Sequence, residues 1–327
     1  MYREVLTMKI IRQYEFGTAS VLKIEETSTP SIGEGEVLIQ GAYTSINFAD
    51  IKNRTGAKIK GDFPFTLGLD IAGTVIESRS SSFQVGDRVI AFPKNGSYAQ
   101  VVVAHENLTY AIPDQLPFEQ AAAMPTVSFL SAMLVDHIAH VTKDDVVVIH
   151  SAAGGVGSML VTLCKHLGCQ TIIGTVSSPT KFDYVKQLGA HIVCTYKEFV
   201  EQTLSIAKNG ATIIFDSVAG DVTEKSLQCL ALFGTLVQFG NSSGRPGNFS
   251  NADVHNSCRS VKGFSLGTTR KLKPELIRPY AEKIIEQFAS GALHLQVDQI
   301  FELEDVVKAH ETFEKRQHNG KILLKLT

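Results

Sequence analysis

The most constraining feature of this sequence is a glycine-rich turn, His150–Gly157 (HSAAGGVG), between two segments of different periodicity. The segment before it, Asp145–His150, carries the apolar run VVVI, which is typical of a strand buried on both faces of a parallel sheet. In the segment after it, apolar side chains recur at helical spacing. A strand, a glycine turn and a helix in this order predict the start of a nucleotide-binding α/β domain.

Strands and helices continue to alternate after this turn, which predicts a doubly wound parallel sheet and the α/β fold class. The further strands are expected at 170–176, 191–194, 211–216 and 235–239. A long Ala-rich helix is expected before the turn, at 118–140, despite Pro125. The tail is expected to contain a strand at 260–266, helices at 274–290 and 304–315, and a last strand at 321–326.

The N-terminal third of the chain has short apolar runs separated by Gly, Pro, Ser and Asn, which indicates an antiparallel β-rich module. The last strand of the chain needs a sheet to join, and this module is its natural host. The β-rich domain is therefore predicted to be discontinuous.

Composition excludes several classes of function. The 327 residues contain 31 basic and 33 acidic side chains, and this balance gives no electrostatic basis for binding nucleic acid. No apolar run reaches the roughly 18 residues of a membrane span, and Met1–Ile10 is too polar for a signal peptide. The five cysteines are read as buried thiols in a reducing compartment, which predicts a cytoplasmic protein.

The glycine turn is the candidate dinucleotide site. Gly154 and Gly155 allow a close approach of the backbone to a pyrophosphate, and Gly157 allows close packing of helix on strand. Ala152 occupies the first glycine position of the usual pattern, and a purely structural turn is the alternative. The expected cofactor-binding residues here are Ala153, Gly154, Gly155, Val156 and Gly157.

The choice of cofactor follows from the next strand. An NAD site has an acidic residue about 20 positions after the glycine turn, but no carboxylate precedes Asp183 here. Ser177, Ser178 and Lys181 instead offer hydrogen bonds and a positive charge to a 2′-phosphate. The sequence thus favours NADPH over NADH, and a helix cap with a solvated lysine is the alternative.

Seven motifs in this order resemble the zinc-free quinone oxidoreductase (zeta-crystallin-like) branch of the medium-chain dehydrogenase/reductase superfamily. These motifs are Ser45–Arg54, Leu67–Val75, Val85–Val89, Ala152–Gly157, Lys181–Ala190, Phe215–Gly220 and Gly320–Leu323. The resemblance implies a GroES-like catalytic domain, formed by residues 1–120 and 268–327, around a Rossmann NADPH-binding domain at 121–267.

Two departures from zinc-dependent relatives indicate that no metal is bound. Those relatives carry a His-Glu pair where this chain has Leu69 and Asp70, and no cysteine precedes Cys164. Without a Lewis acid, hydride transfer requires an acceptor that is already electron-poor, such as a quinone or an α,β-unsaturated carbonyl.

Three residues are the catalytic candidates. Asn47 can donate a hydrogen bond to substrate or cofactor, and a turn-stabilising role is its alternative. Lys52 stands where relatives often carry tyrosine; with Arg54 it is read either as stabilising an enolate or as a solvated surface charge. Asp50 is read as orienting one of these cations or as capping a helix.

The resemblance adds further cofactor contacts. It places Tyr196 near the adenosine phosphate, and Thr126 near the nicotinamide. Phe239, Gly240 and Asn241 follow a strand, where ligands gather at the carboxyl end. Phe264 and Leu266 would close the nicotinamide pocket. Each of these residues is read alternatively as core or turn.

The sequence leaves two functions open: a reductase of quinones or enones, and a non-catalytic NADPH-binding redox sensor or structural protein. A homodimer is also expected, because a strand at 260–266 would lie at the sheet edge, with Val261, Phe264 and Leu266 near the interface.

Overall fold

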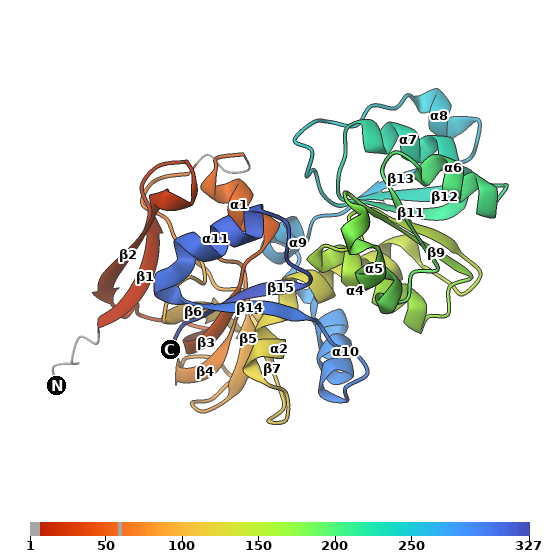
Figure 1. Cartoon of the computed structure of the whole chain (residues 1–327). Coiled ribbons are helices and arrows are strands. Elements are labelled where there is room, and N and C mark those ends of the chain that lie inside the picture. The colour runs from red at the N-terminus through yellow and green to blue at the C-terminus, as the bar shows by residue number, and fades with distance from the viewer. Residues whose placement is uncertain (1–6, 58–60) are drawn as a thin grey trace. The chain divides into compact units, whose positions relative to one another are not determined.

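Two sheets dominate the fold, and each belongs to a different part of the chain (Figure 1). The computed structural model describes residues 7–57 and 61–327. The first unit comprises Met1–Thr126 and Leu272–Thr327, and we call it the β-rich unit. The second, Val127–Lys271, is the parallel-sheet unit.

The parallel-sheet unit contains six strands in the order β10-β9-β8-β11-β12-β13, and every neighbouring pair is parallel. The doubly wound sheet expected from the alternation is confirmed. Its strands are β8 (Val146–Ile149), β9 (Thr171–Val176), β10 (Ile192–Thr195), β11 (Ala211–Asp216), β12 (Leu230–Gln238) and β13 (Ser260–Gly263).

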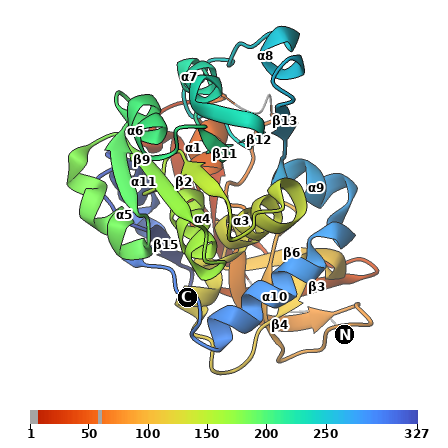
Figure 2. The ribbon, with the colours of Figure 1, turned by 90° about the vertical axis from the view of Figure 1, so that its right-hand side faces the viewer.

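Helices alternate with these strands along the chain, and α9 follows the last of them. Helices α4 and α5 contact each other, as do α6 and α7, so two helix pairs accompany the sheet (Figure 2). The helices are α4 (Gly155–His166), α5 (Phe182–Leu188), α6 (Phe199–Ile206), α7 (Asp221–Cys229), α8 (Asn251–His255) and α9 (Leu266–Leu272). The core of the unit consists of apolar side chains from the strands and from α6 and α7, among them Val148, Ile173, Phe199, Ile214 and Leu227.

The β-rich unit is discontinuous, as the sequence predicts. Strand β15, near the C-terminus, pairs antiparallel with β3, with Leu324 opposite Thr44. Figure 1 shows β14 and β15, in blue, beside the orange strands of the N-terminal segment. The larger sheet holds β3 (Glu36–Ser45), β4 (Ile71–Ser78), β5 (Arg88–Ala91), β6 (Val101–His105), β7 (Thr109–Ala111), β14 (Val297–Glu302) and β15 (Lys321–Lys325).

Four of the strands in this unit have no counterpart in the sequence-based assignment: β7, β14 and the hairpin formed by β1 (Thr7–Gln13) and β2 (Leu22–Ser28). The helices of the unit are α1 (Phe48–Arg54), α2 (Phe118–Ala123), α10 (Arg278–Ala289) and α11 (Val306–Glu314). Its core is apolar and includes Ile11, Ile39, Ile71, Val89 and Ile322, all completely buried.

Several predicted elements differ in extent from the structure; the strand expected at 235–239, for example, begins at Leu230. The helix expected at 118–140 is broken into α2, the π-helical turns η3 (Pro125–Phe129) and η4 (Met133–Ala139), and α3 (Leu130–Ala132). Pro125 explains the first break, because proline lacks the N–H that continues an α-helix.

The strand expected at 260–266 ends at Gly263, and Leu266 begins α9 instead. Phe264 makes the last sheet hydrogen bond, from its N–H to Gln238 O at 3.0 Å. The Ser265 side chain then accepts a hydrogen bond from Thr268 N at 3.2 Å, which favours a helix over further strand.

Candidate functional site

The glycine turn lies between β8 and α4, where the sequence places it. Gly154 precedes the helix with an extended backbone, and α4 begins at Gly155. A Cβ on Gly157 would lie 2.1 Å from Ser151 O, so this position cannot carry a side chain without a shift of the backbone. Helix geometry leaves the first N–H groups of α4 without partners inside the helix, and such groups favour an anion.

A tyrosine holds the start of this turn. The Tyr196 hydroxyl accepts a hydrogen bond from Ser151 N at 2.8 Å and lies 3.1 Å from Ser151 Oγ. The ring of His150 is buried and bonds Thr175 Oγ1 and Ser226 Oγ, both at 2.8 Å. Burial lowers the pKa of His150 to about 4. Tyr196 therefore lies at the predicted cofactor loop, and His150 is a neutral structural side chain.

The residues expected to select the cofactor follow β9. Ser177 is exposed, and Ser178 is partly exposed. The Ser178 hydroxyl accepts a hydrogen bond from Thr180 N at 3.3 Å, so this serine caps the turn before α5. The capping alternative therefore has a geometric basis, and it is compatible with phosphate binding because the hydroxyl can accept and donate at once.

Phe239, Gly240 and Asn241 follow β12 at the same edge of the sheet as the glycine turn, because all six strands run parallel. Phe239 N donates to Asp216 O at 3.0 Å. A Cβ on Gly240 would lie 2.9 Å from Ser217 O, so the two loops approach closely here. The carboxyl edge of the sheet thus gathers three of the predicted cofactor segments.

In the β-rich unit, Asn47 lies in a buried polar cluster that we call the Asn47 cluster, formed by Ser45, Asn47, Asp50, Asp70 and Lys321. Lys321 Nζ donates to Asn47 Oδ1 at 2.7 Å and to Ile46 O at 3.1 Å. The Asn47 amide nitrogen donates to Ser45 Oγ at 3.1 Å and Asp70 Oδ2 at 3.4 Å. Both ends of the amide therefore have partners.

Asp50 lies in the first turn of α1 and is completely buried. Its carboxylate accepts from Asn47 N at 2.8 Å and from Gly68 N at 3.1 Å. Burial raises the pKa of Asp50 to about 7, against the opposing effect of these two N–H groups. This geometry matches the capping alternative for Asp50, and through the Asn47 backbone it also orients that residue.

Thr126 is brought to the same cluster. Its N–H donates to Asp70 Oδ2 at 3.2 Å, the oxygen that also accepts from the Asn47 amide. The Thr126 hydroxyl is buried and has no hydrogen-bond partner within the described ranges. A buried hydroxyl without a partner costs free energy, so a ligand that bonded it would gain affinity.

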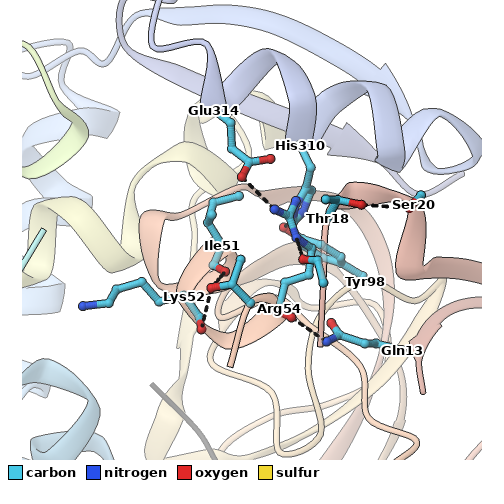
Figure 3. A network of polar contacts seen from close by, with 11 residues as sticks. Gln13, Thr18, Ser20, Ile51, Lys52, Arg54, Tyr98, His310 and Glu314 are labelled. Atoms are coloured by element: carbon cyan, nitrogen blue, oxygen red, sulfur yellow. Dashed lines mark hydrogen bonds and ion pairs between the residues drawn. The ribbon is translucent and has the colours of Figure 1, made fainter. Parts of the chain in front are cut away.

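Arg54 is buried, so the reading of this residue as a solvated surface charge is wrong. Its guanidinium bonds Gly17 O at 3.2 Å, His310 Nδ1 at 3.1 Å and Glu314 Oε1 at 2.7 Å. Figure 3 shows Arg54 beside His310 and Glu314. Helix α11 covers this arginine. Because α11 lies far along the chain, the sequence around Arg54 contains no sign that this residue is buried. Lys52, two residues earlier, points its ammonium group away from this network.

Tyr98 lies between the Arg54 network and the Asn47 cluster. Its hydroxyl lies 3.0 Å from His310 Nε2, and Asp50 is near enough for its charge to raise the pKa of Tyr98. Because arginine can only donate, His310 Nδ1 accepts from Arg54, and Nε2 carries the proton that Tyr98 accepts. Burial, with the nearby charges of Asp50 and Asp70, holds the pKa of Tyr98 well above its usual value.

No functional role is predicted from the sequence for Ser45, Asp70 or Lys321, although all three lie within motifs of the family resemblance. Burial lowers the pKa of Lys321, and the two nearby carboxylates oppose that shift. The available signal was a lysine directly before the apolar run Ile322–Leu324 of the final strand, where an unpaired buried charge would be costly.

The described residues form no group of three or more His, Cys, Asp and Glu side chains suited to a metal ion. No helix within 7–57 and 61–327 is long and apolar enough to cross a membrane. The five cysteines are free; four of them are buried, and Cys258 is exposed, which corrects the expectation that all five are buried.

Comparison with known proteins gives two family matches. Residues 33–114 match the alcohol dehydrogenase GroES-like domain, and residues 155–282 match the zinc-binding dehydrogenase family. The chain is 31% identical to the quinone oxidoreductase of Pseudomonas aeruginosa, over 97% of this chain and 99% of the relative. It is also 28% identical to the zebrafish synaptic vesicle membrane protein VAT-1 homolog, of which it spans 65%.

Solved structures of quinone oxidoreductases and related proteins have a similar fold. The Escherichia coli quinone oxidoreductase complexed with NADPH superposes with a TM-score of 0.90 at 29% identity, covering 98% of this chain and all of that one. A mycobacterial protein complexed with NADPH also has a TM-score of 0.90, at 28% identity, with 97% of this chain and 99% of the other covered.

Proposed function

This chain belongs to the zinc-free quinone oxidoreductase branch of the medium-chain dehydrogenase/reductase superfamily, and we propose that it uses NADPH to reduce quinones or α,β-unsaturated carbonyls. The supporting observation is the turn at the start of α4, where Gly157 has no room for a Cβ beside Ser151 O. A turn of this shape brings backbone N–H groups close to a pyrophosphate.

The residues present fit NADPH. The proposed binding residues of the parallel-sheet unit are Ala153, Gly154, Gly155, Val156, Gly157, Ser177, Ser178, Lys181, Tyr196, Phe239, Gly240, Asn241, Phe264 and Leu266. In the β-rich unit, Thr126 offers a buried hydroxyl with no partner in the described part of the chain. Bound NADPH would supply the hydride.

The protein's own contribution is to orient donors toward the oxygen where negative charge develops. Asn47, Asp50 and Lys52 remain the proposed catalytic residues. The Asn47 amide is the donor, and Asp50 holds the Asn47 backbone through its bond to Asn47 N. We propose a metal-free reaction, because the chain has no cysteine before Cys164 and the described residues form no ligand set.

The test is the rate of NADPH oxidation with a panel of quinones and enones, alongside the dissociation constant for NADPH. We expect turnover well above the uncatalysed rate with at least one acceptor class. Tight NADPH binding without turnover across the panel would instead support the non-catalytic redox sensor or structural protein.

A variant pair sharpens this test. Gly157→Ala should weaken NADPH binding, because the added methyl meets backbone at 2.1 Å. Gly33→Ala is the control, since its methyl would meet the flexible Glu36 side chain at 3.3 Å. Equal affinity in both variants would contradict a cofactor role for the glycine turn.

We also propose a homodimer and a cytoplasmic location. Strand β13 lies at the end of the six-stranded sheet, and Val261 is partly exposed there. An edge strand presents unpaired N–H and C=O groups, and a two-fold axis lets it pair with its own copy.

A further inference from the structure

We propose that Lys321 is a positioning residue that fixes which end of the Asn47 amide faces the reaction site. This inference rests on the proposed function, in which Asn47 donates a hydrogen bond through its NH2 group. It assigns a role to the buried lysine of the last strand.

The two ends of an asparagine amide have nearly the same shape but opposite hydrogen-bonding character: the oxygen accepts and the NH2 group donates. An ammonium group has three donors and no acceptor. Lys321 Nζ lies 2.7 Å from the amide, so the oxygen must face the lysine and the NH2 must point away from it.

The NH2 group of Asn47 points to Ser45 Oγ and to Asp70 Oδ2, with hydrogen bonds of 3.1 and 3.4 Å. The same Asp70 oxygen also accepts a hydrogen bond from Thr126 N, so Asn47 and Thr126 share this partner. Within the described ranges, the Thr126 hydroxyl itself is buried without a hydrogen-bond partner. These bonds are longer than the bond to Lys321, which is therefore the stronger constraint on the amide.

The position of Lys321 is constrained by the segments around it. Lys321 is 3% exposed and follows Gly320, where a Cβ would lie 2.1 Å from Gln296 O. The chain therefore passes too close to its neighbour at this point for any residue but glycine. Nζ also donates to Ile46 O, directly before Asn47, so it bonds both the backbone and the side chain of this segment.

A buried charge of this kind needs compensation. Asp50 and Asp70 are completely buried in the same cluster, and their charges favour the ammonium form of Lys321. The cation therefore has two tasks, to balance buried carboxylates and to orient the Asn47 amide. An experiment has to separate them.

Two single variants make the separation. Lys321→Met removes the donor and should lower kcat/KM for an accepted quinone by roughly tenfold or more. Asn47→Asp keeps an oxygen toward Lys321 but replaces the NH2 by an oxygen that faces Asp70 Oδ2. It should therefore lose turnover, and its melting temperature should fall because two buried carboxylates then meet. Lys325→Met, on the same strand but exposed and paired with Glu302, is the control.

The Lys321→Met/Asn47→Ala double variant tests the coupling. If Lys321 acts through Asn47, the double variant is no slower than Asn47→Ala alone. Fully additive losses would overturn the proposal and leave Lys321 a structural charge. An Asn47→Asp enzyme with wild-type turnover would also overturn it, even if Lys321→Met does not fold.

A spectroscopic readout is independent of turnover. In protein labelled with ¹⁵N on asparagine side chains, the Asn47 NH2 signal is the one that Asn47→Ala removes. Lys321→Met should shift this signal and speed its exchange with solvent, and Lys325→Met should not. An unmoved signal would overturn the proposal. Inactive wild-type protein with a signal that shifts as expected would contradict the proposed function instead.

Discussion

Arg54 and Glu314, 260 positions apart in the sequence, form an ion pair of 2.7 Å in which the arginine is 1% and the glutamate 40% exposed. The pair ties α1 near the N-terminus to α11 near the C-terminus (Figure 3). The two partners thus lie in very different environments, and loss of each has a different cost.

We predict an asymmetric effect of removing the two partners. Arg54→Met should lower the free energy of unfolding by about 3 kcal/mol or more, because His310 and the Gly17 carbonyl lose a buried donor as well. Glu314→Gln should cost at most about 1 kcal/mol, since solvent screens its exposed carboxylate. Urea denaturation measures both, and equal losses would contradict this account.

The buried His310 predicts a dependence of stability on pH. Burial, assisted by the charge of Arg54, lowers the pKa of His310 to about 3. Between pH 6.5 and 3 the unfolded chain takes up a proton that the folded chain does not, so stability falls as the pH drops through this range. The contribution approaches about 1.4 kcal/mol per pH unit.

The corresponding variant is His310→Asn. Its stability, compared with its own value at pH 7.5, should fall less steeply on acidification than that of the wild type. The remaining slope should include the share of His150, whose pKa is lowered in the same direction. Parallel curves for the two proteins would show that His310 is not held neutral.

Cofactor choice gives the third prediction. Lys181→Ala should weaken NADPH binding by roughly 1–3 kcal/mol and leave NADH binding nearly unchanged, from loss of a charge-assisted bond to the 2′-phosphate. Lys186→Ala is the matched control, because Lys186 lies in the last turn of α5, the helix that Lys181 caps at its start. Calorimetry with both cofactors decides, and equal losses would exclude a phosphate contact.

The fourth prediction concerns removal of metal ions. Dialysis against a strong chelator should change neither the melting temperature nor NADPH oxidation. Stoichiometric zinc in the purified protein, lost together with activity, would refute a metal-free reaction.

The edge strand β13 gives the fifth. Sedimentation equilibrium at micromolar concentration should give twice the 35.6 kDa chain mass. Val261→Pro should shift the protein toward monomer, because proline removes a hydrogen-bond donor from the strand. A wild-type mass near that of one chain would rule out a stable dimer.

The parts of the fold that depend on local pattern could be predicted from the amino-acid sequence. Apolar runs, helical periodicity and the glycines of His150–Gly157 predicted the parallel sheet and its nucleotide turn, because each signal spans a few neighbouring residues. The final strand, Lys321–Lys325, was assigned to the N-terminal sheet because a lone strand must find one. Element ends were predicted less accurately: α2 ends before Pro125, and Leu266 begins α9 and does not extend β13.

Which polar side chains are buried together depends on contacts between segments that lie far apart in the sequence. Lys52 and Arg54 are both basic residues of the same segment. Of the two, it is Arg54 that bonds His310 and Glu314, two residues of α11. Asn47 likewise meets Lys321 across 274 positions of sequence. Such contacts are set by the packing of distant segments, which brings charges out of water into a fixed geometry, and no local pattern of residues records that.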